Sequence, residues 1–355
     1  MGDEAPEHLG ADALEALGTR LLAAAGTPAD VAEEVATHVV DNSLRGIDSH
    51  GIVRLPYYLD LIHEGVIDPG GRAAVAKDEP GVTLIDGGGG FGIPAIRLAA
   101  EMMLQKIESQ ASAVAAVVNC GHTGRVGAYA EMIARAGCFA LVLGGGGHER
   151  FRSVVPYGGR EGVMSTNPYA LALPGGPTGA VVVDFATSAT AQGKVLYARA
   201  AGTPLPEGLI IDKQGRPSRN AEDYFAGGFL LPAAGPKGYG LGLIAELLGY
   251  GLLGAPRELN WILFAFDLET FGGREAYRER TESYLAWVKS CAPAPGFGEV
   301  MVPGEPEQRC REARLAEGIA VPPEIRATLC AWAGRLGVDL ADVPGLTWTG
   351  APAPA

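Results

Sequence analysis

The 355-residue sequence predicts an α/β fold whose central strand-and-helix region is flanked by helical parts at both ends. Apolar residues recur at helical spacing through residues 8–64. Short apolar runs then alternate with helical patterns between residues 82 and 200, and charged amphipathic patterns return from residue 273 onward. Apolar periodicity is the main signal for secondary structure, and alternating strands and helices are typical of a sheet covered by helices.

The N-terminal region predicts helices on both sides of a short polar segment. Residues 8–45 have the apolar spacing of two helices, the second with Thr27 as its cap and Pro28 in its first turn. Residues 52–64 predict a further short helix. The polar segment Ser49-His50-Gly51 is therefore expected at a helix–helix junction, where side chains are held rigidly and stay accessible.

The remaining elements follow from the same rules. We expect strands at residues 82–85, 113–118, 139–143, 170–173, 180–185 and 261–267. We expect helices at residues 94–109, 126–136, 191–200, 239–253, 273–291, 305–317 and 323–336. The helix at 239–253 is apolar and punctuated by glycine, so we expect it to be buried. Loops are expected at residues 144–160, which are rich in glycine, and at 202–236.

Composition excludes several classes of function. The net charge of −13 disfavours nucleic acid as a partner, because binding phosphates requires a basic face. The sequence has no charge-free apolar stretch of about 18 residues, so no membrane span is expected. The five cysteines form no Cys-x-x-Cys pair, which fits a reduced cytoplasm and predicts no metal site. A small anionic substrate would need local cations.

One glycine-rich motif is misleading. Residues 87–92 satisfy G-x-G-x-x-G between a predicted strand and a predicted helix, as in a Rossmann dinucleotide site. A run of four glycines satisfies that pattern trivially, however. The next strand ends in Asn119-Cys120 and lacks the acidic residue that would hold a ribose. We therefore interpret residues 87–92 as a turn beneath a helix N-terminus.

The segment around His50 has residue types suited to proton transfer. A histidine exchanges protons near neutral pH, and Ser49 could hydrogen-bond to it or relay its proton. Arg54 follows four residues later, so it shares a helix face with His50 and could bind a carboxylate. Taken alone, His50 is more simply a histidine bonded to a helix-end carbonyl, and Arg54 is as readily part of a surface ion pair.

Two further polar residues follow predicted strands. His122 lies in a glycine-rich loop, where it could act as a second acid/base or as an ordinary turn residue. The segment Gly124-Arg125-Val126 then opens a helix whose amides could contact a cofactor phosphate. Asp184 ends an apolar run and needs a partner, because an unpaired buried carboxylate is costly. It could orient a histidine or serine, or cap the helix that begins near Ser188.

These motifs, taken together and in this order, resemble the type-2 malate/L-lactate dehydrogenase family. Residues 158–168 and 184–194 carry the resemblance most strongly, and it extends from the N-terminal helices to Glu307. It is strongest to the hydroxycarboxylate dehydrogenase branch, through residues 121–131 and 287–318.

The resemblance implies a non-Rossmann α/β fold, like that of L-sulfolactate dehydrogenase, with an inserted cofactor domain. Its parts would be an N-terminal helical part (residues 1–75) carrying Ser49, His50 and Arg54, a cofactor-binding domain (76–255), and a C-terminal part (256–355) that packs back on the first. It also implies a homodimer with active sites near the subunit interface.

The resemblance also implies roles for single residues. His50 would be the proton donor, with Ser49 and Asp184 completing a relay, Arg54 on the substrate carboxylate and His122 as a second acid/base. Thr166, in the segment 165–168, is a further substrate candidate. The implied cofactor contacts are His50, Gly124, Arg125, Val126, Val182, Val183, Asp184, Phe185, Ala186, Asn260, Gly304, Glu305, Pro306 and Glu307.

Two segments depart from the family pattern. Many members have a histidine where this chain has Pro236. The stretch 144–152, mostly apolar in the branch it resembles, here holds four glycines followed by a charged segment. We hypothesise that this loop shapes substrate choice and that Arg150 or Arg152 reads a second anionic group.

The sequence thus predicts an enzyme that interconverts a small 2-oxo acid and a 2-hydroxy acid with NAD or NADP. A reductase of a cyclic 2-imino acid, of the piperideine- or pyrroline-2-carboxylate type, would use the same clamp and donor. A non-catalytic cofactor-binding relative also stays open. A metal hydrolase using His50, His122 and Asp184 is disfavoured, because their spacing matches no local ligand motif.

Overall fold

A seven-stranded sheet forms the centre of the computed structural model, which describes residues 6–200 and 202–348. The strand order is β2-β3-β4-β11-β5-β6-β7. β3 pairs with β4 in parallel through helix α4, and the other neighbours pair antiparallel. The strands are β2 (Ala74–Glu79), β3 (Val82–Asp86), β4 (Ser112–Val118), β5 (Cys138–Gly145), β6 (Pro168–Pro174), β7 (Ala180–Ala186) and β11 (Asn260–Asp267).

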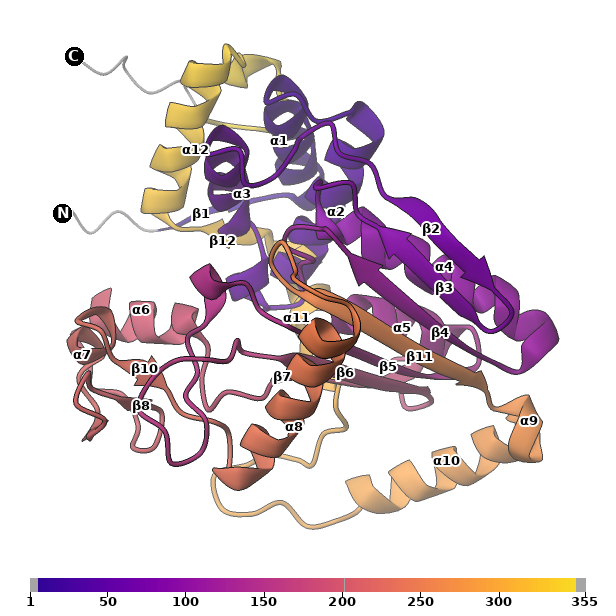
Figure 1. Cartoon of the computed structure of the whole chain (residues 1–355). Helices are drawn as coiled ribbons and strands as arrows, with labels where there is room; N and C mark the ends of the chain where they lie inside the picture. The colour runs from indigo at the N-terminus through magenta and orange to yellow at the C-terminus, as the bar shows by residue number, and fades with distance from the viewer. Residues whose placement is uncertain (1–5, 201, 349–355) are drawn as a thin grey trace.

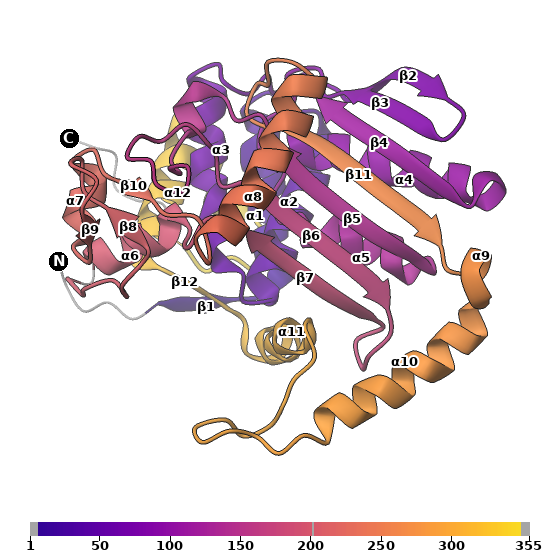
Figure 2. The same cartoon turned by 60° about the horizontal axis from the view of Figure 1, so that its bottom comes forward.

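Helices cover the two faces of this sheet unequally. α4 (Gly92–Gln110) and α5 (Gly127–Arg135) pack on one face and bury a large apolar core with the strands. α8 (Pro236–Glu246) crosses the opposite face, where it covers a much smaller cluster around Tyr169 (Figure 2). β7 is the edge strand of the sheet beside α5.

The two ends of the chain build a second, helical core. α1 (Ala11–Ala24), α2 (Ala29–Leu44) and α3 (Arg54–His63) pack with α12 (Pro323–Leu336) around buried leucines and Trp332 (Figure 1). β1 (Glu7–Leu9) pairs with β12 (Ile319–Val321) in a separate two-stranded sheet. Residues far apart in sequence thus surround the junction at His50.

A small outlying unit lies beside these two cores. It contains α6 (Gln192–Ala200), α7 (Ala221–Phe225) and three two-residue strands, β8 (Ile210–Ile211), β9 (Pro217–Ser218) and β10 (Phe229–Leu230). α9 (Glu269–Gly272) and α10 (Arg274–Lys289) then run away from the body as an arm before α11 (Glu305–Glu317) returns to it (Figures 1 and 2). No helix within residues 6–200 and 202–348 has the length and apolar character needed to cross a bilayer.

Two expectations about helices were wrong. α8 and the π-helical turn that continues it (Leu247–Leu252) are only partly buried: Ile244, Leu247 and Tyr250 are 54%, 57% and 59% exposed. One face packs on the sheet around Leu143 and Tyr169, and apolar side chains of the other face are exposed in the described chain. Thr27 does not cap α2, because the chain enters the helix through Pro28, and the Thr27 hydroxyl is buried without a hydrogen-bond partner.

The glycine-rich segment 87–92 is a close backbone crossing. A Cβ on Gly90 would lie 2.3 Å from the Gly71 carbonyl oxygen, and one on Gly87 would lie 2.9 Å from the Asn119 oxygen. Gly88 and Gly89 have positive φ angles of 61° and 71°. The glycines are therefore required by the turn and its neighbours, as the sequence predicted.

Candidate active site

The segment that carries His50 is fixed from several sides. Asp48–His50 form one 3₁₀ turn, in which the Ser49 Oγ lies 3.0 Å from the His50 Nδ1. The Asn42 side chain donates to the His50 carbonyl (3.1 Å). Gly51 is required because a Cβ there would lie 2.2 Å from the Ser43 Oγ. The imidazole of His50 is thereby held with its Nε2 free of hydrogen bonds within residues 6–200 and 202–348.

A residue from the far end of the chain completes this support. Arg314 on α11 donates to the Ser43 carbonyl and forms an ion pair with Asp48, 2.5 Å between Nη1 and Oδ1. Arg314 and Asp48 are separated by 266 positions in the sequence. The C-terminal part therefore stabilises the turn that presents Ser49 and His50.

The structure brings His50 and His122 together. Their rings stack with centroids 5.6 Å apart. The His122 Nδ1 accepts a hydrogen bond from the Gly124 amide (3.1 Å) and lies 2.8 Å from the Tyr58 hydroxyl. Because an amide can only donate, we assign the neutral tautomer of His122 that carries its proton on Nε2. His122 can thus offer an N–H donor to a group beside His50.

The charge of Arg54 acts on both histidines. The Nε of Arg54 donates to the Ser49 carbonyl (2.6 Å), and its guanidinium lies over the Tyr57 ring at 5.4 Å. These contacts orient the side chain. Within the described residues no hydrogen bond occupies its terminal nitrogens, which leaves them able to bind a carboxylate.

The environment keeps both histidines neutral. Burial, then the charges of Arg54 and Arg125, lowers the pKa of His50 to about 4. Burial, then Arg54 and the neighbouring histidines, holds the pKa of His122 well below its usual value. At neutral pH, His50 is therefore able to accept a proton, and His122 is able to donate a hydrogen bond without being charged.

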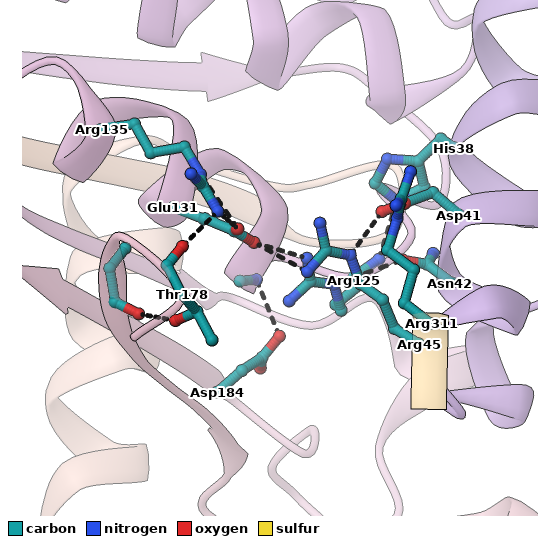
Figure 3. A network of polar contacts seen from close by, with 12 residues as sticks. His38, Asp41, Asn42, Arg45, Arg125, Glu131, Arg135, Thr178, Asp184 and Arg311 are labelled. Atoms are coloured by element: carbon teal, nitrogen blue, oxygen red, sulfur yellow. Dashed lines mark hydrogen bonds and ion pairs between the residues drawn. The ribbon is translucent and has the colours of Figure 1, made fainter. Parts of the chain in front are cut away.

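Asp184 has a different partner from the expected relay. Its Oδ2 accepts a hydrogen bond from the Gly127 amide (2.7 Å), so it caps the start of α5 and not the helix after Ser188 (Figure 3). In the described part of the chain no hydrogen bond joins Asp184 to Ser49 or His50. Burial raises the pKa of the Asp184 carboxyl. The residue thus positions the helix that follows His122.

Arg125 points into the protein. It is 5% exposed, and its guanidinium bonds to Asn42 (3.3 Å) and Glu131 (3.2 Å), as Figure 3 shows. Its backbone amide donates to the Nε2 of His38 (3.0 Å). Asn42 also holds the His50 carbonyl, so this buried network connects α2, α5 and the turn that carries His50.

The amides expected to meet a cofactor phosphate are already bonded. Those of Gly124, Arg125 and Gly127 donate to His122, His38 and Asp184 respectively. Val126 is buried in the main core. In this conformation the start of α5 therefore offers a side-chain-capped surface and not a set of free donors.

The other expected cofactor segments meet at the edge strand β7. The Val182 amide donates to the Pro303 carbonyl (3.4 Å), which places the start of α11 (Gly304, Glu305, Pro306 and Glu307) beside β7. Along β7, Val182, Asp184 and Ala186 face the α5 side. Val183 and Phe185 face the opposite side, where Phe185 stacks on Tyr169 at 6.0 Å.

Of three further residues expected to contact the cofactor, Glu305 and Asn260 are already bonded within the protein, and Glu307 has an oxygen without a partner. Glu305 accepts the Val302 amide (2.8 Å) and pairs with Lys289. Asn260 donates to the carbonyls of Gly249 and Gly254, each at 2.9 Å, and it lies on β11, three strands from β7. Glu307 has an Oε2 that is buried with no hydrogen-bond partner.

The expected substrate residues of the glycine-rich loop lie at the rim. Arg150 pairs with Glu64 on the loop after α3 (3.0 Å), and Arg152 with the Gly147 carbonyl (3.3 Å) and Glu149 (3.8 Å). The Thr166 carbonyl accepts the Thr187 amide (2.9 Å). Pro236, the departure noted above, is the first residue of α8.

Three residues of the site escaped the sequence analysis. Tyr58 lies four residues after Arg54 on α3, so the two residues share a face of that helix. His50, by contrast, lies in the 3₁₀ turn before α3 and not on the same helix as Arg54, contrary to the expectation from sequence. His38 has no local signal, because its partner Arg125 is 87 positions away. Glu258 precedes β11, and burial raises the pKa of its carboxyl to about 7.

Comparison with known proteins identifies the family. Residues 9–330 match the family described as malate/L-lactate dehydrogenase. An L-lactate dehydrogenase of Cupriavidus necator is 34% identical over 91% of this chain and 96% of its own length. A Δ1-pyrroline-2-carboxylate/Δ1-piperideine-2-carboxylate reductase of Pseudomonas putida is 31% identical over 82% and 86%.

The fold comparison agrees. The sulfolactate dehydrogenase structure from Methanocaldococcus jannaschii superposes with a TM-score of 0.85 and 29% identity, covering 95% of this chain and 99% of that one. The fold is thus of the non-Rossmann type that the sequence predicted. The chain belongs to the malate/L-lactate dehydrogenase family and is an enzyme of the 2-hydroxyacid dehydrogenase and related reductase class.

Proposed function

We propose that this protein interconverts a small 2-oxo acid and the corresponding 2-hydroxy acid with NAD or NADP. The observation that carries the proposal is the stack of His50 on His122 (5.6 Å), with Arg54 bonded to the Ser49 carbonyl next to His50. This arrangement combines a proton acceptor, a neutral hydrogen-bond donor and an anion clamp, which are the groups this reaction needs.

Each of these side chains has one task. Arg54 binds the substrate carboxylate, and the Nε2–H of His122 donates to the oxygen on C2. His50 accepts the hydroxyl proton in the oxidising direction. A carboxylate on Arg54 offsets the charge that lowers the pKa of His50, so substrate binding raises that pKa and lets the same imidazole carry the proton for reduction. Ser49 holds the ring through its Nδ1.

The residues beside β7 suit a nicotinamide dinucleotide, which would supply or accept the hydride at C2. The partnerless Oε2 of Glu307 can accept a hydrogen bond from a ribose hydroxyl or a carboxamide. Gly304 has a φ of +100°, so the chain turns closely around β7 there. Val182 to Ala186 and the start of α5 complete the surface that we assign to the cofactor.

A cyclic 2-imino acid is the alternative substrate. The relative from Pseudomonas putida carries that activity in its name, and the same clamp and donor would serve an imine. Protonated imine nitrogen would take the place of the oxo oxygen, and the expected geometry at Arg54 is the same.

We further propose that the protein is a cytoplasmic homodimer. The outward apolar face of α8 and the turn after it, with Ile244, Leu247 and Tyr250 exposed, has the composition of a subunit interface. All five cysteines are free, as in a reducing compartment. If the protein is not a homodimer, sedimentation at micromolar concentration will show a monomer.

The deciding experiment follows NADH and NADPH oxidation at 340 nm with a panel of 2-oxo acids and cyclic imino acids. We expect turnover with at least one acid, and a loss of about a thousandfold in His50→Ala. His63→Ala, at the far end of α3 against Trp332, is the matched control and should keep its activity. Turnover unchanged in His50→Ala would refute the mechanism.

A further inference from the structure

We propose that Asn42 is a positioning residue: it fixes the placement of the two imidazoles of the candidate site relative to each other, by bridging the turn that carries His50 to the segment that follows His122. Asn42 is absent from the motifs identified in the sequence. The catalytic consequence of this bridge rests on the proposed function, whereas its effect on the geometry of the rings can be tested without turnover.

The side chain of Asn42 forms hydrogen bonds at both of its polar atoms. Its Nδ2 donates to the His50 carbonyl (3.1 Å), and its Oδ1 accepts from the Nε of Arg125 (3.3 Å). A guanidinium can only donate and a carbonyl can only accept, so one orientation of the amide satisfies both neighbours. Arg125 follows His122 by three positions in the sequence. One side chain therefore connects the two segments that carry the imidazoles.

An asparagine at this position is costly without its two bonds. Asn42 is 1% exposed and lies near the end of α2 (Ala29–Leu44). Asparagine has a low helix propensity, and burying an amide without partners is unfavourable. The bonds to His50 and Arg125 offset this cost. They are also what an amide supplies here and an apolar side chain of the same size does not.

The same face of α2 holds Arg125 a second time. His38 precedes Asn42 by about one helical turn, and its Nε2 accepts the Arg125 backbone amide (3.0 Å). Figure 3 shows His38 and Asn42 coming from one helix and pointing toward Arg125. The Nη2 of Arg125 also donates to Glu131 on α5 (3.2 Å). Arg125 is thus fixed through its backbone and its side chain, so it presents a well-placed donor to Asn42.

The end of α2 also holds the turn at His50 on either side. The Ile47 amide donates to the Asn42 carbonyl (2.9 Å), and the Ile52 amide donates to the Oγ of Ser43 (2.8 Å). The bond from the Asn42 amide to the His50 carbonyl lies between these two contacts along the chain. The backbone before, at and after His50 is therefore attached to two consecutive residues of α2.

The bridge matters because the two rings come from different parts of the fold. His50 belongs to the N-terminal helical part, whereas His122 follows strand β4 of the central sheet. Their rings nevertheless stack with centroids 5.6 Å apart. In the proposed reaction both Nε2 atoms must reach the same substrate oxygen, and misplacing a reacting group by about 1 Å can lower the rate about a hundredfold. Asn42 thus acts on the rate through His50, without touching the substrate.

Two variants each break one half of the bridge. Asn42→Asp keeps the shape and an acceptor for Arg125, but it sets a carboxylate oxygen against the His50 carbonyl. Arg125→Met removes the donor on the other side of the amide. We expect each variant to lower kcat at least about tenfold and to change KM less than about threefold. Asp41→Asn, the matched control, ends the ion pairs of the neighbouring residue of α2 and should keep kcat within about twofold.

Contacts between the rings provide a measurement that does not depend on turnover. The chain has six histidines, so their imidazoles can be labelled selectively and assigned by substitution. We expect nuclear Overhauser effects between the rings of His50 and His122 in the wild-type chain. These effects should weaken in Asn42→Asp and Arg125→Met and persist in Asp41→Asn. Thermal melting shows whether each variant is folded, and Asn42→Ala replaces Asn42→Asp if the latter does not fold.

The outcomes separate this proposal from the proposed function. If no acid is turned over, the proposed function fails, and the contacts between the rings still decide the role of Asn42. Ring contacts that stay unchanged in Asn42→Asp overturn the inference. So does an unchanged kcat when the ring contacts weaken, because the placement of the rings would then not limit the rate. An equal loss of kcat in Asp41→Asn also overturns it, because any damage to the end of α2 would then have the same effect.

Discussion

At the residue scale, the site depends on keeping histidines neutral. His50 and His122 are partly buried, and their neutral forms are favoured for the same reasons: loss of hydration and the positive charge of Arg54. The hydrogen bond from the Gly124 amide fixes which nitrogen of His122 holds its proton. Two adjacent imidazoles can therefore take different roles, one as base and one as donor.

Arg54 should control the basicity of His50. Replacing it with methionine removes the second-largest cause of the low pKa, so we expect the pKa of His50 to rise from about 4 by about one pH unit. The imidazole resonances followed by NMR across pH report this directly. Arg72→Met, at an exposed pair with Asp30, is the control. A His50 titration that stays in place would show that burial alone lowers its pKa.

At the scale of elements, α11 acts as a brace for a turn on the other side of the molecule. Arg314 reaches both Ser43 and Asp48, which flank the segment that leads into Ser49 and His50. The helix itself has few buried side chains, with Glu305 the only one within its described span. Its contribution therefore lies in this contact and in the start of the helix beside β7.

Arg314→Ala should loosen the catalytic turn without unfolding the protein. We expect kcat to fall about tenfold while the melting temperature changes by only a few degrees, because misplacement of a reacting group costs rate more than stability. Arg314→Lys should restore part of the loss. Arg309→Ala, on the same helix and paired with the exposed Glu299, serves as the matched control. Equal losses in both variants would argue against a role in positioning.

Elements with strong periodicity were predicted well from sequence. α11 and α12 begin and end at the expected residues, and the buried strands β4, β5 and β11 differ by a residue or a few at their ends. The strand β2 was missed, because its second half is charged, its apolar residues do not alternate with polar ones, and all its residues are exposed at the sheet edge. α8 was predicted as buried because apolar composition alone does not reveal whether other elements of the fold cover both faces of a helix.

The site was predictable only where its residues are local in sequence. Although His50 lies in the 3₁₀ turn before α3 and does not share a helix with Arg54, the proximity of Arg54 to the segment Ser49–His50 follows from spacing. The partners of Asp184 and Arg125 do not, because Gly127 is 57 positions from Asp184 and His38 is 87 positions from Arg125. A carboxylate that ends a strand can meet any element of the fold, so its partner requires the tertiary structure.

At the scale of the whole molecule, buried neutral histidines make stability depend on pH. Burial and then Arg125 lower the pKa of His38 to about 3, while an unfolded chain titrates near 6.5. The unfolded state therefore binds the extra proton between these values. The contribution of His38 is complete above about pH 6.5 and is lost as the pH falls toward 3.

His38→Gln should weaken this acid sensitivity. Glutamine can still accept the Arg125 amide but does not titrate, so the fall in unfolding free energy between about pH 7.5 and about pH 4.5 should be smaller than in the wild-type chain by about 2 kcal/mol. Urea denaturation at a series of pH values measures both slopes. Parallel curves for the two proteins would mean that His38 is not the group responsible.

The ion pair between Asp48 and Arg314 also has a consequence for the order in which parts of the chain fold during synthesis. Its partners are 266 positions apart in the sequence. β1 likewise pairs with β12, which lies near the other end of the chain. A growing chain that leaves the ribosome exposes residues 48–50 early, yet the residues that brace them are synthesised near the end. Contacts of such long sequence separation form late and slowly. A nascent or prematurely terminated chain that stops before α11 therefore holds the side chains proposed for catalysis but lacks the contact that braces Asp48, so we expect activity only after the last part of the chain has been synthesised.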